Sequence, residues 1–162
     1  MKFLIRASRT TNIAVEKILA AMGLSMALIV ALQVLCRYGL NHSLFWSEEL
    51  ARFLLVWLTF LGSTAAYYRG VHPGIDILTN RLSAKSQLCC RIAVYLLSLP
   101  LFLVMIYHGS AFAYFVRLQI SPALGLPKWI VFSIIPASSV IFLLYCLTFL
   151  LSDFLKWLRH DD

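Results

Sequence analysis

The sequence contains few charged residues, and acidic residues are especially scarce. Only 13% of its 162 residues are charged, with seven acidic side chains in total, whereas 61% are hydrophobic and the mean hydropathy is +0.84. Water-soluble globular domains carry about 25% charged residues, so the composition excludes them and predicts an integral membrane protein. No polar stretch is long enough to form a separate soluble domain. We therefore expect a single membrane domain over residues 1–162.

Four apolar runs approach the length of about 20 residues that a helix needs to cross a hydrocarbon core about 30 Å thick. They predict an all-α integral membrane protein with four transmembrane helices over residues 14–36, 48–68, 88–115 and 129–151. The first run continues to Arg37 and is too long for the apolar core of a cleaved signal peptide. We expect short interfacial amphipathic segments within residues 70–87 and in the C-terminal tail. Pro100 predicts a kink in the third helix.

Lysine and arginine are unevenly divided between the two sides of these helices. The first and third loops hold three, Arg37, Arg117 and Lys128. The termini and the second loop together hold ten: Lys2, Arg6, Arg9, Lys17, Arg69, Arg81, Lys85, Arg91, Lys156 and Arg159. The positive-inside rule then places the N- and C-termini in the cytoplasm. Because basic residues beside apolar runs set topology, the net charge of +7 does not indicate a nucleic-acid partner.

Small and polar side chains recur along the first two helices. Gly23, Ala27 and Ala31 lie at four-residue spacing and predict the close approach of a neighbouring helix. A polar seam at helical intervals follows the second helix: Glu48, Arg52, Thr59, Ser63 and Ala66. Two interpretations of this seam remain open, namely packing within the bundle and docking onto another membrane protein.

Charged residues gather at the start of the second helix, near one membrane interface. Glu48 and Arg52 are four residues apart and can form an ion pair on one helical face. Ser47 precedes them and is expected to cap the helix. Charge at membrane depth is costly, so the cluster is either a cap that anchors the helix or a polar contact with a partner subunit.

The predicted helices lack acidic residues near the middle of the bilayer. A secondary transporter that works alone usually has ionisable groups there, together with inverted repeats, and this sequence shows neither. It also shows no zinc-ligand spacing, nucleotide-binding loop or catalytic triad. We therefore expect a helper that holds another membrane protein in place, with no metal or cofactor of its own.

The competing interpretation is a membrane enzyme, a four-helix thiol/quinone oxidoreductase. Such an enzyme needs reactive cysteine pairs, and the sequence offers four cysteines: Cys36, Cys89, Cys90 and Cys146. None of them forms a Cys-x-x-Cys pair, and small apolar packing is the simpler role for cysteines in such a chain. We therefore do not expect an enzyme.

Several motifs, arranged in order around the four helices, resemble a known family. They are Gln33-Val34-Leu35-Cys36-Arg37-Tyr38 with Asn41, Trp46-Ser47-Glu48-Glu49-Leu50-Ala51-Arg52, Trp57-Leu58-Thr59-Phe60-Leu61-Gly62, His72 with Asp76, and Leu124-Gly125-Leu126-Pro127-Lys128-Trp129 with Ile135-Pro136. Pro73 departs from the family's pattern. The combination is similar to the small membrane subunit, the DctQ type or Q subunit, of tripartite ATP-independent periplasmic (TRAP) transporters.

The resemblance implies a small scaffold subunit of a sodium-coupled transporter in the bacterial inner membrane. A large membrane subunit (M type) would carry an organic anion, such as a C4-dicarboxylate, a sialic acid or another sugar acid, together with sodium through an elevator-type movement. A periplasmic substrate-binding protein (P type) would deliver the substrate, and phospholipid would occupy the seam between the subunits. The small subunit would brace the large one and help to dock the binding protein.

The resemblance also gives roles to residues at matched positions. Four residues would orient the second helix and its outer loop: Trp46, Glu48, Glu49 and Arg52. Arg37 and Asn41 would shape the same periplasmic corner.

Two further pairs of residues take roles from the resemblance in the other loops. His72 and Asp76 would organise the cytoplasmic turn, with a solvated loop as the alternative. Arg117 and Lys128 would meet an acidic patch on the binding protein, or else lie among lipid headgroups.

Overall fold

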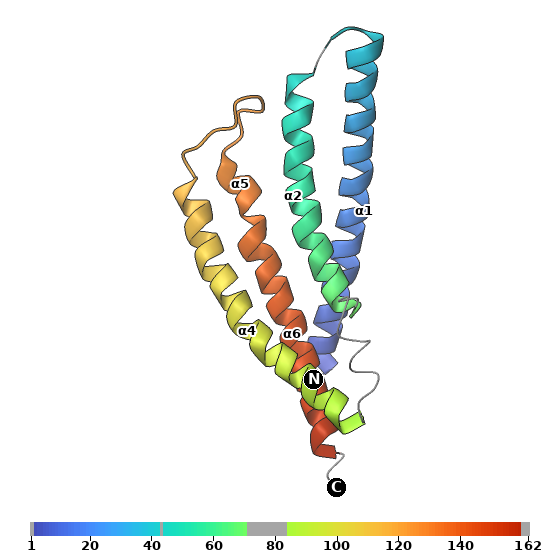
Figure 1. Ribbon diagram of the computed structural model, residues 1–162, viewed down its shortest axis with the longest axis vertical. Coiled ribbons are helices and arrows are strands. Elements are labelled where there is room, and N and C mark those ends of the chain that lie inside the picture. Colours follow the sequence, from blue (N-terminus) through green and yellow to red (C-terminus); the bar gives the residue numbers. More distant parts are fainter. Residues whose placement is uncertain (1, 43, 71–83, 160–162) are drawn as a thin grey trace.

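Helices make up nearly all of the computed structural model, which describes residues 2–42, 44–70 and 84–159. They are α1 (Lys2–Gly39), α2 (Phe45–Tyr68), α4 (Ala84–Phe115), α5 (Lys128–Phe132) and α6 (Ile134–Arg159) (Figure 1). Four stretches are long and apolar enough to cross a membrane, and α5 and α6 together form the fourth. The predicted all-α architecture with four spanning helices is confirmed. The amphipathic segment expected within residues 70–87 lies largely outside the described residues.

Both termini lie toward the same end of the bundle (Figure 1), and we call this the terminal end. The opposite end carries the connections from α1 to α2 and from α4 to α5, and we call it the loop end. An even number of spans requires this arrangement. The cytoplasmic location of the terminal end stays a prediction.

α1 is longer than the apolar run that predicts it. It begins at Lys2 rather than at residue 14, and its 38 residues span about 57 Å at a rise of about 1.5 Å per residue. Hydropathy detects only the part of a helix that lies in lipid, whereas a helix continues wherever one of its faces stays packed. Ser8, Asn12 and Val15 are buried on one face of these N-terminal turns. The predicted span, residues 14–36, lies within α1, and the basic segment before it is also helical.

α2 begins at Phe45, and Ser47 does not cap it. Leu44 occupies the N-cap position with extended backbone angles, φ −90° and ψ 94°, and makes no side-chain cap. Ser47 lies buried inside the first turn, where its hydroxyl donates a hydrogen bond of 2.7 Å to the Leu44 carbonyl oxygen. The expected cap is wrong because the helix starts at Phe45, two residues before the serine. Ser47 therefore lies inside the first turn, where its hydroxyl cannot accept hydrogen bonds from the unpaired N–H groups at the start of the helix.

The last predicted span is divided into α5 and α6 at Ser133. Pro136 has no N–H to bond the carbonyl of Phe132, and its ring crowds that carbonyl, so the helix is interrupted one turn before the proline. Trp57 of α2 reaches this junction, and its indole N–H donates to the Val131 carbonyl oxygen at 3.1 Å. This hydrogen bond connects α2 to the junction. No local sequence pattern predicts it, because the two residues are 74 positions apart.

α4 remains helical through Pro100 and bends along its length (Figure 1). The predicted kink is thus a bend without a break. Gly109 of the same helix is buried against the α5–α6 junction. A Cβ atom placed there would lie 2.8 Å from Ile135 Cγ2 and 3.2 Å from Pro136 Cδ. The two helices can therefore cross this closely only because Gly109 has no side chain.

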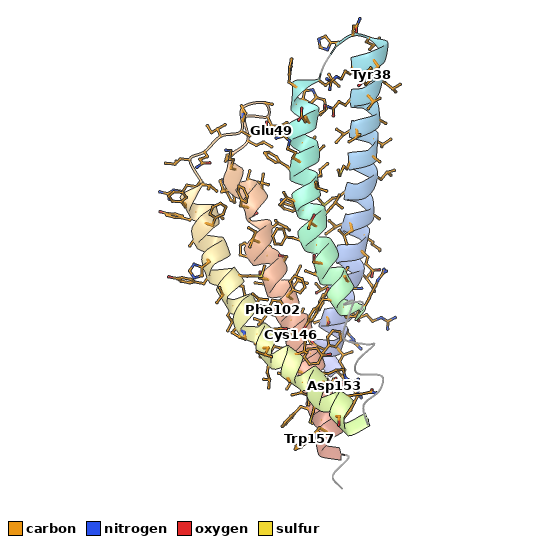
Figure 2. All side chains as sticks on the ribbon, in the orientation of Figure 1. Tyr38, Glu49, Phe102, Cys146, Asp153 and Trp157 are labelled. Atoms are coloured by element: carbon orange, nitrogen blue, oxygen red, sulfur yellow. The ribbon has the colours of Figure 1, made fainter. Side chains whose placement is uncertain are left out.

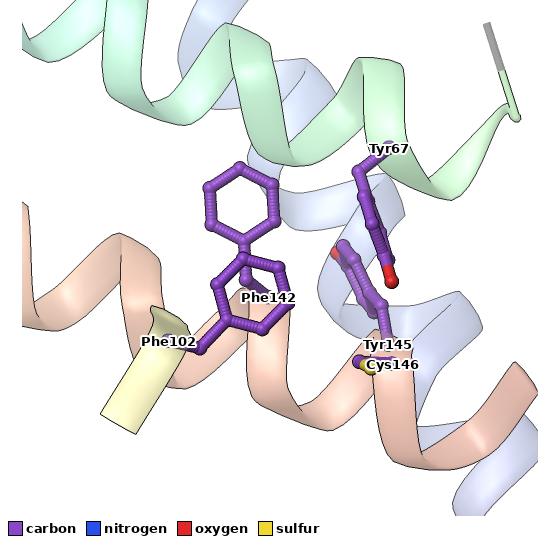
Figure 3. Close-up of a cluster of buried hydrophobic side chains, with 5 residues drawn as sticks. All are labelled: Tyr67, Phe102, Phe142, Tyr145 and Cys146. Carbon is purple, nitrogen blue, oxygen red and sulfur yellow. The ribbon is translucent and has the colours of Figure 1, made fainter. Parts of the chain in front are cut away.

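α6 is the central helix of the bundle. It packs against α4 on one side and α2 on the other, while α1 packs mainly against α2 (Figure 1). An aromatic cluster fills the place where α2, α4 and α6 meet (Figure 3): Tyr67, Phe102, Phe142, Tyr145 and Cys146. The rings of Phe102 and Phe142 stack with their centroids 5.0 Å apart, and Tyr67 meets Phe142 edge-on at 5.5 Å. These ring contacts hold the three helices together.

The small-residue stripe of α1 does not meet another helix among the described residues. A Cβ atom at Gly23 would have nothing within 4 Å, and Ala27 and Ala31 are exposed. The expected close approach is therefore wrong for this chain by itself. α1 instead packs through a different face, where Val15 joins a buried cluster with Leu61 of α2.

Candidate functional site

The polar cluster predicted at the start of α2 is divided between two faces of the helix. Glu48 and Arg52 form the expected ion pair on one face, and their side chains are 63% and 72% exposed. Glu49 lies on another face, toward the loop between α4 and α5 (Figure 2). Trp46 is exposed at the same end. The sequence therefore predicts the ion pair correctly, but only the structure separates Glu49 from it.

Glu49 fixes the loop between α4 and α5. Its Oε2 atom accepts hydrogen bonds from the backbone N–H groups of Ala123 and Leu124, at 2.9 and 3.0 Å. Hydrogen bonds from backbone N–H groups to a carboxylate are charge-assisted and strong. Gly125 follows with φ +65°, in the left-handed region that favours glycine. A carboxylate at the start of α2 thus ties down a loop that is distant in the sequence and that backbone hydrogen bonds, such as Ser121 N–H to the Leu126 carbonyl oxygen at 2.9 Å, also stabilise.

Arg117 and Lys128 lie at the base of this loop. The Arg117 guanidinium sits 3.7 Å from the centroid of the Tyr114 ring, a cation–π contact. The Lys128 ammonium donates to Gln119 Oε1 at 3.3 Å. Neutral groups therefore position both cations, and no acidic residue of the described chain pairs with either of them. Both charges remain available to an anionic partner.

Arg37 and Asn41 lie where α1 ends. Asn41 adopts a left-handed backbone conformation, φ 53°, and the N–H of the next residue, His42, donates to the Cys36 carbonyl oxygen at 3.0 Å. Asparagine in this conformation is a common helix terminator. Arg37 and Asn41 are both exposed. The structure places them at the loop end with Glu48, and neither bonds to the start of α2 within the described chain.

Two sets of ion pairs that local sequence patterns do not predict join the helices at the terminal end. Glu16 of α1 accepts from Arg69, which follows the last turn of α2, at 2.9 Å. Asp153 of α6 accepts from Arg91 of α4 at 3.0 Å and from Lys156 at 3.1 Å (Figure 2). The Asp153 side chain is only 10% exposed. Each ion pair between helices connects two spans at the same level, so these contacts fix the helices relative to one another.

The position of Asp153 in the sequence could have indicated that it forms an ion pair. It is the first acidic residue after Asp76, and it lies at the end of a long apolar run. A lone carboxylate in such a place needs a cationic partner, because an unpaired charge at membrane depth is costly. His72 and Asp76 themselves lie outside the described residues, so the turn that they were expected to organise stays a prediction.

Charged residues lie at two levels along α2, with Glu49 near its start and Arg69 just after its end. Glu49 and Arg69 are separated by 20 residues, which is about 30 Å of helix and matches the thickness of the hydrocarbon core. The aromatic cluster packs between helices of the bundle (Figure 3). Within the described ranges no group of three His, Cys, Asp or Glu side chains could hold a metal ion. The charged side chains of the described residues therefore lie toward the two ends of the bundle.

The four cysteines are free and lie in different surroundings. Cys146 is fully buried in the aromatic cluster, where its thiol donates to the Tyr95 carbonyl oxygen at 3.4 Å. Cys89 is exposed at the start of α4, and Cys36 is half-buried near the end of α1. Cys146 therefore acts as a small packing residue.

Comparison with known proteins identifies relatives over most of the chain. Residues 26–156 match the family model of tripartite ATP-independent periplasmic transporters, DctQ component. The chain is 30% identical over 118 residues to a putative TRAP transporter small permease protein of Haemophilus influenzae, and the match covers 72% of this chain and 73% of that protein. It is 33% identical over 126 residues to the C4-dicarboxylate TRAP transporter small permease protein DctQ of Rhodobacter capsulatus, with 69% and 48% covered.

A further relative is much longer than this chain. The isethionate TRAP transporter permease protein DctMQ of Oleidesulfovibrio alaskensis is 28% identical over 132 residues. The match covers 74% of this chain but only 20% of that protein. The similarity therefore extends to a segment of a larger permease polypeptide.

Proposed function

Because this chain belongs to the DctQ family of TRAP transporter small membrane subunits, we propose that it is a stationary scaffold for the large membrane subunit. The family consists of transporter components rather than enzymes, and the four spans make the chain a multi-pass protein of the inner membrane. One observation supports the scaffold role, namely that contacts between distant parts of the chain stabilise both ends of the bundle. At the terminal end these contacts are the ion pairs between helices, and at the loop end they are the hydrogen bonds from the loop between α4 and α5 to Glu49. A body braced in this way suits a fixed support.

The large subunit docks, in this proposal, on the exposed stripe of α2. The stripe is defined by four residues: Glu48, Arg52, Thr59 and Ser63, all of them exposed. Buried residues of the same helix, such as Leu61 and Ala65, face α1 and α6 instead, so packing within the chain leaves the stripe uncovered. Small and hydroxyl-bearing residues are common where membrane helices meet. The longer relative DctMQ, in which the matched segment is part of a permease chain, supports a large membrane partner.

At the loop end, we propose that the Glu49-held loop presents Arg117 and Lys128 to an acidic surface of the periplasmic binding protein. Two observations support this role. Glu49 gives the loop a defined conformation, and the two cations are exposed or half-buried without an acidic partner in the described chain. Binding to lipid headgroups is the alternative role for the same charges.

The transport chemistry itself belongs, in this proposal, to the large subunit. Sodium and the substrate bind there, and the small subunit needs no cofactor. Relatives are named for C4-dicarboxylates, isethionate, sialic acid and ectoine. Most of these compounds are organic anions, which is the class of substrate that we propose. Phospholipid fills the seam between the two subunits.

Arg52→Ala is expected to reduce recovery of the large subunit about tenfold when this chain is purified from membranes in mild detergent. The reason is that a hydrogen bond to a charged group contributes about 1.5–3 kcal/mol. Arg52→Lys keeps the charge and should retain most of the assembly. Uptake of substrate by the reconstituted transporter is the second measurement, and it should fall together with recovery.

A pair of bulky substitutions tests the location of the docking stripe. Ser63 and Ala93 are both small and exposed, but only Ser63 lies on the stripe. Ser63→Trp should block assembly, whereas Ala93→Trp on α4 should leave it intact. Undiminished recovery of the large subunit with both Arg52→Ala and Ser63→Trp would show that the docking face lies elsewhere.

Reversing both charges, Arg117→Glu with Lys128→Glu, is expected to raise the concentration of binding protein needed for half-maximal uptake by roughly tenfold, because like charges would then face each other. Recovery of the large subunit should not change, and this separates docking from folding. An unaltered dependence of uptake on binding-protein concentration would return these residues to the headgroup role.

A further inference from the structure

A row of cations runs along the N-terminal half of α1. We call it the basic stripe, and it consists of four exposed residues: Lys2, Arg6, Arg9 and Lys17. At 3.6 residues per turn these four positions fall within a sector of about 80° around the helix axis. The buried residues Ser8, Asn12 and Val15 lie on the opposite side. The packed face of α1 therefore orients the whole stripe away from the bundle.

Among the residues that the structure describes, the cations of the basic stripe have no counter-charge. Glu16 is the one acidic residue of α1, and Arg69 and Asn12 already donate to its carboxylate at 2.9 and 2.8 Å. The four basic side chains make no hydrogen bond or ion pair with any residue that the structure describes. Four such charges on one exposed face create a positive potential that attracts anionic groups.

Exposed apolar side chains accompany the basic stripe. Phe3 is 80% exposed, and Ile5 and Ile13 are each 46% exposed. At the same end of the bundle, Phe154 and Leu155 of α6 are 46% and 47% exposed. Cations interleaved with apolar side chains suit the boundary between acyl chains and headgroups, where the apolar groups enter the lipid and the cations reach the phosphates.

The length of α1 favours the same location. At about 57 Å the helix is longer than a bilayer of about 40–45 Å with its headgroups. Its N-terminal turns, which precede the apolar run at residues 14–36, therefore leave the hydrocarbon core on the side of the terminal end and cross the headgroup layer there. The distance from Lys17 to Lys2 is about 22 Å of helix, so a tilt of the helix brings more of the basic stripe within reach of the headgroups.

We propose that the basic stripe binds the anionic headgroups of phospholipids at the terminal end and thereby sets the tilt and depth of α1. The occupant is a lipid with a phosphodiester and a net negative charge, such as phosphatidylglycerol. The continuity of the stripe with the membrane span of its own helix places it beside such headgroups. This surface is separate from the docking stripe on α2 and does not require the large subunit.

Lipid counting by native mass spectrometry tests the proposal. The full chain, purified in mild detergent, is titrated with phosphatidylglycerol and with phosphatidylcholine of the same acyl chains. The double variant Arg6→Gln, Arg9→Gln should lose roughly fivefold or more of the preference for phosphatidylglycerol, because surface attraction to anionic lipid scales with each basic residue. The matched variant Arg6→Lys, Arg9→Lys keeps the charges and should keep the preference. Higher salt should weaken the preference of the unmodified chain.

Three results would overturn the proposal. The first is an equal lipid preference in the glutamine variant and the unmodified chain. The second is a preference that salt does not change. The third is a glutamine variant that retains its lipid preference but loses the large subunit on purification, which would assign the stripe to a protein partner.

Discussion

Gly109→Ala is expected to destabilise the folded chain by about 2 kcal/mol, within the range of about 1–3 kcal/mol for overpacked sites. The added methyl group would lie 2.8 Å from Ile135 Cγ2 and 3.2 Å from Pro136 Cδ. Neither neighbour yields easily, because the isoleucine is branched at Cβ and the proline is a ring at the α5–α6 junction. The midpoint of thermal unfolding in detergent measures the effect.

Gly23→Ala provides the matched control for this substitution. Both glycines lie inside helices, so alanine brings the same gain in helix propensity, about 1 kcal/mol, at each position. A Cβ atom at Gly23 would have nothing within 4 Å. Gly23→Ala should therefore leave the unfolding midpoint unchanged or raise it. Equal midpoints for the two variants would show that α4 and α6 do not cross as closely as described.

Asp153→Ala is expected to lower the free energy of unfolding by about 2 kcal/mol. Breaking a fully buried ion pair costs about 3–5 kcal/mol, and this pair falls below that range because Arg91 is half exposed. The substitution removes the acceptor of both Arg91 and Lys156 and so releases the contact between α4 and α6. Thermal or denaturant unfolding of the purified chain gives the value.

The Glu48–Arg52 ion pair at the loop end provides a comparison for the effect of Asp153→Ala on the free energy of unfolding. Glu48→Ala breaks the Glu48–Arg52 pair, whose side chains are both mostly exposed, and should cost at most about 1 kcal/mol. A double-mutant cycle with Arg91→Gln isolates the coupling between Arg91 and Asp153. A coupling energy near zero would mean that Asp153 stabilises the fold by another route.

Local patterns predicted the features that depend on nearby residues. The four apolar runs gave the four spans, and the four-residue spacing of Glu48 and Arg52 gave their ion pair. The same reasoning misplaced the cap of α2 at Ser47, and it did not show that α1 extends from the apolar run back to Lys2. Hydropathy reports where lipid ends, and a helix can continue beyond that point when packing supports it.

Contacts between distant residues were beyond the reach of such patterns. Glu49 and Ala123 are 74 residues apart, as are Trp57 and Val131. No pattern in the sequence marked Gly109 as a place where two helices come close. The four-residue spacing of Gly23, Ala27 and Ala31 did predict such a contact, but it does not form among the described residues. A stripe of small residues permits close approach, but the rotation of each helix decides which stripe is used.

The amino-acid sequence alone determined that this protein crosses the membrane four times as helices and that its charges lie near the ends of the spans. It could do so because the preference of each side chain for lipid or water is a local property that adds up along a segment. Only the tertiary structure decided which acidic residues form ion pairs between helices, which loop Glu49 holds and which faces of α1 and α2 stay uncovered. Those outcomes depend on how the helices rotate and cross, and no single segment of the chain contains that information.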